Sequence, residues 1–257
     1  MHSHLCRHGE GEIDQYVEKA IEKGLSEIGF AEHIPIPGLD DPTGRMDIRD
    51  FSLYLNDVAD AQKRYPEITV RLGLEADYLP GFMDFISAFI WGHPFDFVIG
   101  SVHFIGDWDF TNPAFLHKFE EFGVDSAWIS YYRLLTEAAS TGLYDIIGHF
   151  DVIKKFKRFP SSDISEHVST ALQTIKQNDL VLDVNTAGKR GPVREIYPSP
   201  EILKRAYDMD IPVILGSDAH APHEVAFFFP ECLNTLQQIG YSETVIFSHR
   251  QRSTVPL

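Results

Sequence analysis

Val213-Ile-Leu-Gly-Ser-Asp-Ala-His220 is the stretch of sequence that decides the fold. Its first three residues form a short apolar run, which is typical of a strand covered on both faces. Gly216 and Ser217 then open a turn, and Asp218 and His220 follow two residues apart. Residues at i and i+2 of an extended segment point the same way. A carboxylate and an imidazole therefore converge at the carboxyl end of a strand, which indicates a site for a first-row metal ion.

Strand-like runs that end in a histidine or a carboxylate recur along the chain. Each run is short and apolar, and each is followed by a turn or a loop. The runs end at Glu32-His33, Glu75, His103, His149 and Asn185, and Asp77, Asp151 and Thr186 follow three of them. A barrel of parallel strands would gather these ends around one mouth.

Composition limits the class of protein. The chain of 257 residues is long enough for one large α/β domain, and its hydrophobic content of 44% supports a substantial core. The net charge of −16 argues against nucleic acid or an anionic membrane as partner, because those surfaces need basic patches. No apolar run approaches the roughly 20 residues of a membrane span. With two cysteines and no signal peptide, we expect a cytoplasmic protein, and its oligomeric state stays open.

Strand and helix patterns alternate along the chain, with connections too short for separate domains. We therefore expect residues 1–257 to form a single α/β barrel with its site at the carboxyl ends of the strands. A doubly wound open sheet is the alternative, but it would place ligands at one switch point. The aromatic-rich insertion 104–123 is predicted to cover the site as a lid. Helices are predicted at 12–23, 47–65, 82–91, 124–141, 162–178, 200–209 and 230–239, a loop at 35–45 and a last strand at 244–247.

Histidines and carboxylates at the predicted mouth are candidate metal ligands. Any one of them alone is more often structural, since a histidine at a strand end commonly bonds a loop carbonyl. Together they exceed the roughly four ligands that one zinc-like ion takes. Two or three divalent ions that share a carboxylate fit better, with Glu75 as the bridge. Such ions activate water and clamp phosphoryl groups, so metal-dependent phosphoester hydrolysis is predicted. The candidates are His2, His4, His8, His33, Glu75, His103, His149, Asp218 and His220.

Basic residues in this acidic chain follow the strand ends. Guanidinium groups can bind phosphate through two parallel hydrogen bonds. For any one of these basic residues, a position in a solvated loop is as good an interpretation as phosphate binding. The residues of the run 154–158 cannot all face one phosphate. The residues concerned are Arg45, Lys154, Lys155, Lys189 and Arg190.

These segments resemble the PHP superfamily (polymerase and histidinol phosphatase), and within it the histidinol-phosphatase branch. The order and spacing of the segments, taken together, are specific. The segments extend over nearly the whole chain. The matching segments are Cys6-Arg-His8-Gly-Glu-Gly, Ala31-Glu-His33, Gly73-Leu-Glu75-Ala-Asp77-Tyr, Ile99-Gly-Ser-Val-His103, Ile147-Gly-His149-Phe-Asp151, Asp183-Val-Asn-Thr-Ala-Gly188 and Gly216-Ser-Asp218-Ala-His220.

The resemblance implies a distorted barrel of about seven β/α units and a trinuclear cluster of divalent ions such as zinc, iron or manganese. It also implies hydrolysis of L-histidinol phosphate in histidine biosynthesis. One ion would bind the N-terminal histidine pair with Glu75 and Asp218. The others would bind Glu75, His103 and His149, and His8, His33 and His220. The resemblance assigns the substrate phosphate to Arg45, Lys154 or Lys155, and Arg190.

The start of the chain departs from the family, which opens with Asp-x-His-x-His on its first strand. Counting back from Cys6 and His8 makes His2 the second histidine of that pair. The first histidine and its strand would then precede Met1. The other alignment pairs His2 with His4, but it leaves the spacing to His8 two residues short. We favour the first alignment and expect a truncated first strand.

The leading hypothesis is therefore a histidinol-phosphatase. The ions, Arg190 and Arg45 would neutralise charge that develops on the phosphoryl group. The leaving alkoxide would be stabilised by a metal or protonated by a site acid, for which Asp151 is a candidate. The alternatives are a phosphodiesterase or nuclease of the same superfamily and a metal-binding barrel without activity. The acidic composition counts against a nuclease. The predicted catalytic residues are Glu75, His103, Asp151, Asp218 and Arg190.

Overall fold

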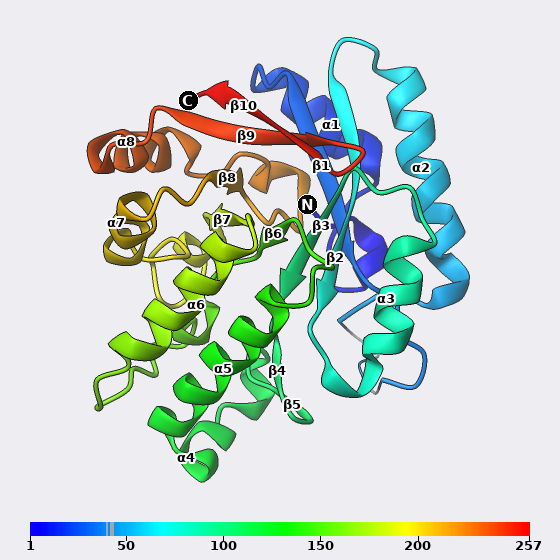
Figure 1. Ribbon diagram of the computed structural model, residues 1–257. Helices are drawn as coiled ribbons and strands as arrows, with labels where there is room; N and C mark the ends of the chain where they lie inside the picture. Colours follow the sequence, from blue (N-terminus) through cyan, green and yellow to red (C-terminus); the bar gives the residue numbers. More distant parts are fainter. Residues whose placement is uncertain (40, 42–43) are drawn as a thin grey trace.

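The computed structural model describes residues 1–39, 41 and 44–257 (Figure 1). Residues 40, 42 and 43 belong to the loop predicted at 35–45 and lie outside the described residues. The helices are α1 (Ile13–Glu22), α2 (Phe51–Arg64), α3 (Met83–Trp91), α4 (Lys118–Phe122), α5 (Val124–Ala139), α6 (Ser165–Gln177), α7 (Pro200–Asp208) and α8 (Phe229–Ile239). Short 3-10 turns lie at His4–Cys6, Ile48–Asp50, Pro80–Phe82, Pro113–Phe115, Val152–Lys154, Ala187–Lys189 and Pro222–Glu224.

Six parallel strands form one curled sheet. Their order follows the sequence, and the helices pack around the outside (Figure 1). The strands in order are β1 (Glu27–His33), β2 (Thr69–Asp77), β3 (Phe97–Ser101), β6 (Ile146–Ile147), β7 (Val181–Asn185) and β8 (Val213–Gly216). The sheet is a half-barrel of the TIM-like class that the strand endings predict. Among the described residues no ladder joins its edge strands, β1 and β8.

Helix α1 illustrates why the predicted helices form. Tyr16, Val17 and Ala20 are buried at helical spacing. Glu12 and Gln15 form a reciprocal capping box at its start. Gly24 follows its end with φ of +72°, a conformation that favours glycine. Local signals therefore determine both ends of this helix. Within the described residues, no helix is long and apolar enough to cross a membrane.

A small apolar core lies inside the curve of the sheet. Phe97 packs directly on the neighbouring strands, where a Cβ on Gly73 would lie 2.3 Å from its ring and one on Gly29 would lie 2.7 Å away. The predicted last strand is confirmed as β9 (Glu243–Ser248), which pairs with the unpredicted β10 (Gln251–Pro256). Because β9 packs on the first residues of β3, β6 and β7, it closes the amino-terminal end of the half-barrel. The core comprises Ala31, Phe97, Ile146, Val181, Val245 and Phe247.

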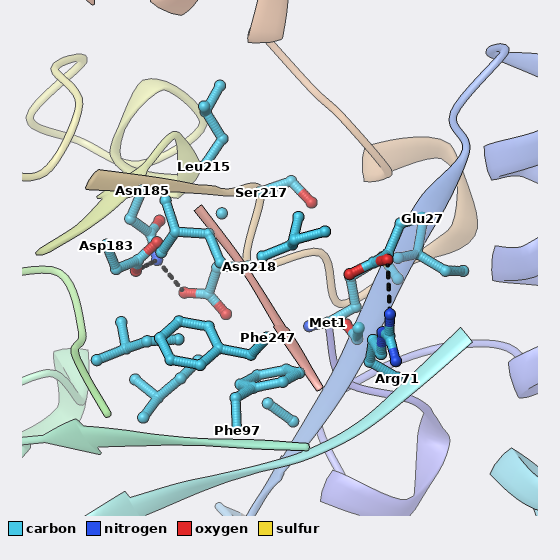
Figure 2. A pocket seen from close by; sticks show the side chains of 18 of the residues that line it. Met1, Glu27, Arg71, Phe97, Asp183, Asn185, Leu215, Ser217, Asp218 and Phe247 are labelled. Atoms are coloured by element: carbon cyan, nitrogen blue, oxygen red, sulfur yellow. Dashed lines mark hydrogen bonds and ion pairs between the residues drawn. The ribbon is translucent and has the colours of Figure 1, made fainter. Parts of the chain in front are cut away.

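Met1 and His2 lie in the gap between β1 and β8. The N-terminal amine of Met1 donates to Gly29 O (3.3 Å), and Ala31 N donates to Met1 O (3.0 Å). His2 N donates to Ala219 O beyond β8 (2.9 Å). Beside Met1 lies a cavity of about 260 Å³ with Phe97 and Phe247 on its wall (Figure 2). These bonds place residues 1 and 2 in the gap, in parallel register with β1.

We expect that adding about four apolar, β-branched residues before Met1 stabilises the protein, since a strand rises roughly 3.3 Å per residue. The added segment would pair with the open edges of β1 and β8 and fill the cavity beside Met1. Cavity volume costs about 24 cal/mol per Å³, so partial filling should contribute a few kcal/mol. Each kcal/mol corresponds to about 2–4 °C in Tm for a chain of this size, so we expect a rise of roughly 5 °C or more.

Thermal unfolding followed by circular dichroism would measure this effect. A glycine- and serine-rich extension of equal length is the matched control and should leave Tm unchanged. Equal gains from both extensions would contradict strand pairing.

Candidate metal centre

Side chains from five strand ends and from the N-terminal segment meet in one cluster. Parallel strands bring their carboxyl ends to the same edge, as the sequence pattern predicts. The cluster comprises His33 at the end of β1, Glu75 on β2, His103 after β3, His149 after β6, Asp218 and His220 after β8, and His2 and His8 from the N-terminal segment.

Glu75 lies at the centre of the cluster and is almost fully buried. His2 Nε2 lies 3.1 Å from its Oε2, and His149 Nε2 lies 3.1 Å from its Oε1. His103 Nε2 and His33 Nδ1 approach within 3.6 and 3.7 Å. Burial alone would raise the pKa of Glu75, but the charge of His33 and hydrogen bonds from His149 and His2 hold it well below its usual range. Glu75 is therefore an anionic hub, as its place in the sequence pattern predicts.

The cluster contains sets of three side chains whose ligand atoms lie within 4.8 Å of one another. Two of these sets coincide with ligand sets that the resemblance implies. His220 Nδ1 bonds Asp218 O (2.9 Å), and its Nε2 is buried without a hydrogen-bond partner in the described structure, so Nε2 has a lone pair available. This donor set fits divalent ions. The sets are His2, Glu75 and Asp218; Glu75, His103 and His149; His2, His33 and His220; Cys6, His8 and His220; and His33, Asp77 and His103.

The carboxylates of the cluster raise the pKa values of two of its histidines, His2 and His103. Burial alone would lower the pKa of His2, but hydrogen bonds to Asp218 and Glu75 raise it to about 9. Burial likewise opposes charge on His103, yet the Asp77 carboxylate raises its pKa to about 9. Without metal, the cluster therefore carries protons on His2 and His103. A divalent ion would replace those protons.

His4 lies outside the cluster, unlike the other predicted ligands. Its side chain is 45% exposed, and its Nδ1 is 3.3 Å from Glu12 Oε2. His2 and His4 point to opposite sides because residues 4–6 turn into a 3-10 helix, so the i, i+2 rule for extended chain does not apply. The alignment that makes His2 the N-terminal ligand agrees with this geometry.

Lys154 and Asp151 form a buried ion pair and do not line the site. Lys154 Nζ lies 2.8 Å from Asp151 Oδ2 and 2.6 Å from Glu195 Oε2. Asp151 also accepts a hydrogen bond from Ser199 N. Burial raises the pKa of Asp151 to about 6, against the charge of Lys154. Of the alternatives Lys154 and Lys155 for the phosphate, the structure therefore places Lys155 on the pocket wall, and Lys154 and the candidate acid Asp151 behind it.

Arg190 supports the loop that carries Asp218. Its guanidinium donates to Ser217 O (2.9 Å) and Asp218 O (2.8 Å), and its Nε lies 2.9 Å from Glu224 Oε1. These protein contacts already engage its three nitrogens. In the structure Arg190 thus holds the loop that carries Asp218, and its predicted role on the substrate phosphate stays a prediction.

A pocket of about 390 Å³ opens onto the cluster. The insertion 104–123, predicted as a lid, contributes Asp109 and Thr111 to its wall after the hairpin of β4 (Phe104–Ile105) and β5 (Trp108–Asp109). Of the predicted phosphate-binding residues, Arg45 and Lys155 line this pocket. The pocket therefore offers a small, partly enclosed space between metal ligands and basic side chains.

The PHP domain family matches residues 1–187 of this chain. This chain belongs to the PHP domain family. Two relatives place it in the histidinol-phosphatase branch. The probable histidinol-phosphatase of Deinococcus radiodurans is 38% identical over 98% of this chain and 96% of its own length. The histidinol-phosphatase of Bacillus subtilis is 34% identical over 89% of this chain and 95% of its own length.

A solved structure shares the PHP fold of this chain. Histidinol phosphate phosphatase from Lactococcus lactis, complexed with Zn, L-histidinol and phosphate, superposes with a TM-score of 0.82. The two chains are 23% identical, and the match covers 98% of this chain and 97% of the other. This likeness supports the half-barrel fold.

Asp77 is a supporting residue of the PHP centre that sequence reasoning did not assign. Its Oδ1 lies 2.7 Å from His103 Nδ1, and its Oδ2 accepts from Arg45 (3.1 Å). Arg45 also bonds Asp41 (2.8 Å), so its charge is largely committed to carboxylates. The spacing in the sequence could have indicated this role, because Asp77 follows Glu75 by two residues on β2 and points to the same face. Asp77 therefore orients His103 with Nε2 toward Glu75.

Replacing Asp77 with asparagine should lower kcat for phosphate release about 10- to 100-fold, the usual effect of removing a carboxylate behind a metal-ligating histidine. The amide keeps the size of the side chain but does not stabilise the orientation of His103 in the same way. Steady-state kinetics would test this, with Asp60→Asn on exposed α2 as the control. Wild-type kinetics in the Asp77 variant would contradict the orienting role.

Proposed function

We infer that this chain is a metal-dependent phosphomonoesterase that hydrolyses L-histidinol phosphate to L-histidinol and phosphate. The observation that carries this inference is the buried Glu75, surrounded by imidazoles and facing a small pocket with Lys155 on its wall. The family and the two named relatives support the choice of substrate. Histidine biosynthesis in the cytoplasm is the corresponding setting, and a small molecule, with no nucleic acid, is the partner.

Two to three divalent ions would be held by three ligand sets, of which the first two have ligand atoms within 4.8 Å of one another. His2, Glu75 and Asp218 would hold one, Glu75, His103 and His149 a second, and His8, His33 and His220 a third. Bound ions would activate water and stabilise negative charge on the phosphoryl oxygens. The ligands are nitrogen and oxygen atoms, which accept zinc, iron or manganese.

Lys155 is the side chain best placed to attract the phosphate. Its Nζ donates to Thr111 O (3.0 Å), which holds the ammonium at the pocket wall. Burial lowers its pKa, and Asp218 and Asp109 oppose that effect. Arg45 lines the same pocket, but it is already paired with Asp41 and Asp77 and would therefore be a weaker phosphate contact than Lys155. We therefore propose Lys155 as the principal phosphate contact outside the metal ligands, with Arg45 in support.

The test is phosphate release from L-histidinol phosphate by protein loaded with zinc, iron or manganese, measured beside a generic aryl phosphate. Rapid release that favours L-histidinol phosphate would agree with the proposal. Release from single-stranded DNA and not from either monoester would indicate a nuclease. Bound metal without turnover on any of these substrates would indicate a metal-binding barrel without activity.

A further inference from the structure

Glu32 is a fully buried carboxylate directly before His33 in β1. Its Oε1 accepts hydrogen bonds from Ser3 N (2.6 Å) and Ser3 Oγ (2.7 Å). Its Oε2 is buried without a hydrogen-bond partner in the described structure. Unpartnered carboxylate oxygens are costly to bury, so this atom calls for an explanation.

The nearest candidate partner is His2. The Oε2 atom of Glu32 lies 3.9 Å from His2 Nδ1, which is also buried and without a hydrogen bond in the described structure. The other ring nitrogen of His2, Nε2, lies 3.1 Å from Glu75 and 3.2 Å from Asp218. The imidazole therefore lies between the carboxylates of the centre, Glu75 and Asp218, and the Glu32 carboxylate behind it.

The His2 ring has little freedom to turn. It stacks against both His33 and His220, with a distance of 4.4 Å between ring centroids in each pair. Its backbone is held because His2 N donates to Ala219 O and Tyr16 Oη donates to His2 O. The ring orientation is thus determined, and what remains to be set is which nitrogen carries the proton.

We propose that Glu32 is a positioning residue that keeps the proton of neutral His2 on Nδ1. A neutral imidazole has one N–H, and a nitrogen that binds a metal must present a lone pair. With the proton on Nδ1 facing Glu32, Nε2 is bare and faces Glu75 and Asp218. A carboxylate behind a ligating histidine commonly acts in this way. This inference rests on the proposed metal-dependent function.

Glu32→Gln is the decisive variant. Ser3 N and Oγ would keep the amide oxygen as their acceptor, so the amide NH₂ would face His2 Nδ1. That arrangement favours a bare Nδ1 and puts the proton on Nε2, which is the wrong tautomer for binding. We expect zinc affinity, measured by chelator competition, to fall about 10- to 100-fold for the ion that His2 holds.

Two other variants distinguish control of the His2 proton by Glu32 from a general effect of charge on β1 and from a tether to Ser3. Glu27→Gln removes a carboxylate from the same strand, where Glu27 pairs with Arg71, and should bind zinc like the wild type. Ser3→Ala weakens the tether between Ser3 and Glu32 but leaves the carboxylate facing His2, so its zinc affinity should change far less than that of Glu32→Gln. Equal losses in Ser3→Ala and Glu32→Gln would overturn the proposal and show that Glu32 acts only as a tether.

Nitrogen NMR of the zinc-loaded wild type tests the same point without a variant. The His2 ring should show Nδ1–H and a metal-shifted Nε2. A proton on Nε2, or zinc on Nδ1, would overturn the role of Glu32, as would wild-type zinc affinity in Glu32→Gln. Absence of zinc binding in the wild type would instead refute the proposed function from which this inference starts.

Discussion

Replacing Glu75 with glutamine should reduce phosphate release from L-histidinol phosphate by at least about 10³-fold, equivalent to roughly 4 kcal/mol of transition-state stabilisation. Glu75 belongs to two of the five ligand sets, so one substitution weakens two sites. An amide supplies no negative charge to hold the neighbouring imidazoles and ions. The bound metal measured by elemental analysis should fall in parallel with kcat.

The fold should survive this change. Glutamine has nearly the volume of glutamate, and Ser101 Oγ, which donates to Glu75 Oε1 (2.6 Å), can donate to the amide oxygen as well. Far-ultraviolet circular dichroism should therefore match the wild type. Glu67→Gln, an exposed carboxylate outside the centre, is the control and should retain full activity. Substantial turnover by the Glu75 variant with normal metal content would refute the role of Glu75 as the shared ligand.

Removing bound metal with a chelator should stop turnover and lower Tm. A ligand that binds the folded state at about 1,000 times its Kd stabilises that state by about 4 kcal/mol. For a chain of this size that free energy corresponds to about 8–16 °C. Differential scanning calorimetry before and after chelation would measure the shift, and readdition of zinc or manganese should restore Tm and activity together.

Proton release provides an independent check of the same reaction. The pKa values of His2 and His103 are raised to about 9 in the metal-free protein, so both are protonated at pH 7.5. Metal must displace those protons, and affinity should therefore weaken as the pH falls. Calorimetric titrations in buffers of different ionisation enthalpy would count the protons. Binding without proton release would show that these histidines are not ligands.

These raised pKa values also determine whether the stability of the metal-free protein rises or falls with pH. The folded-state pKa values of His2 and His103 exceed the ordinary value of 6.5. Their contribution to stability is therefore fully present below pH 6.5 and is lost as the pH rises toward 9. Urea unfolding of the metal-free protein between pH 6 and 9 should show this loss. A rise in stability over that range would contradict the assignment.

Much of this protein follows from local sequence. Alternating apolar runs and helical periods predict the parallel strands and their helices, because burial and hydrogen bonding act on segments of 5 to 15 residues. Parallel strands must present their carboxyl ends at one edge, so His33, Glu75, His103 and His149 could be grouped without coordinates. Asp218 and His220 both reach the centre, but Asp218 has φ of +47°, so the extended segment expected at 218–220 does not form.

Only the tertiary structure determined in which direction each side chain points after a short turn. Lys154 and Lys155 are adjacent, yet the first is buried against Asp151 and Glu195 while the second faces the pocket. His2 enters the centre while His4 turns outward to Glu12. No local period distinguishes such neighbours, because their directions depend on short turns whose geometry is determined by packing.

Pairings between distant segments also required the folded chain. Asp77 orients His103 across 26 residues, and Ser3 binds Glu32 across 29. β9 covers the amino-terminal end of the half-barrel with Val245 and Phe247, and β10, which has no apolar pattern, pairs with it. The sequence by itself thus determined the kind of site and most of its inner ligands. The folded structure determined which charges lie behind them, since a buried charge takes whatever partner the packing brings within hydrogen-bond distance.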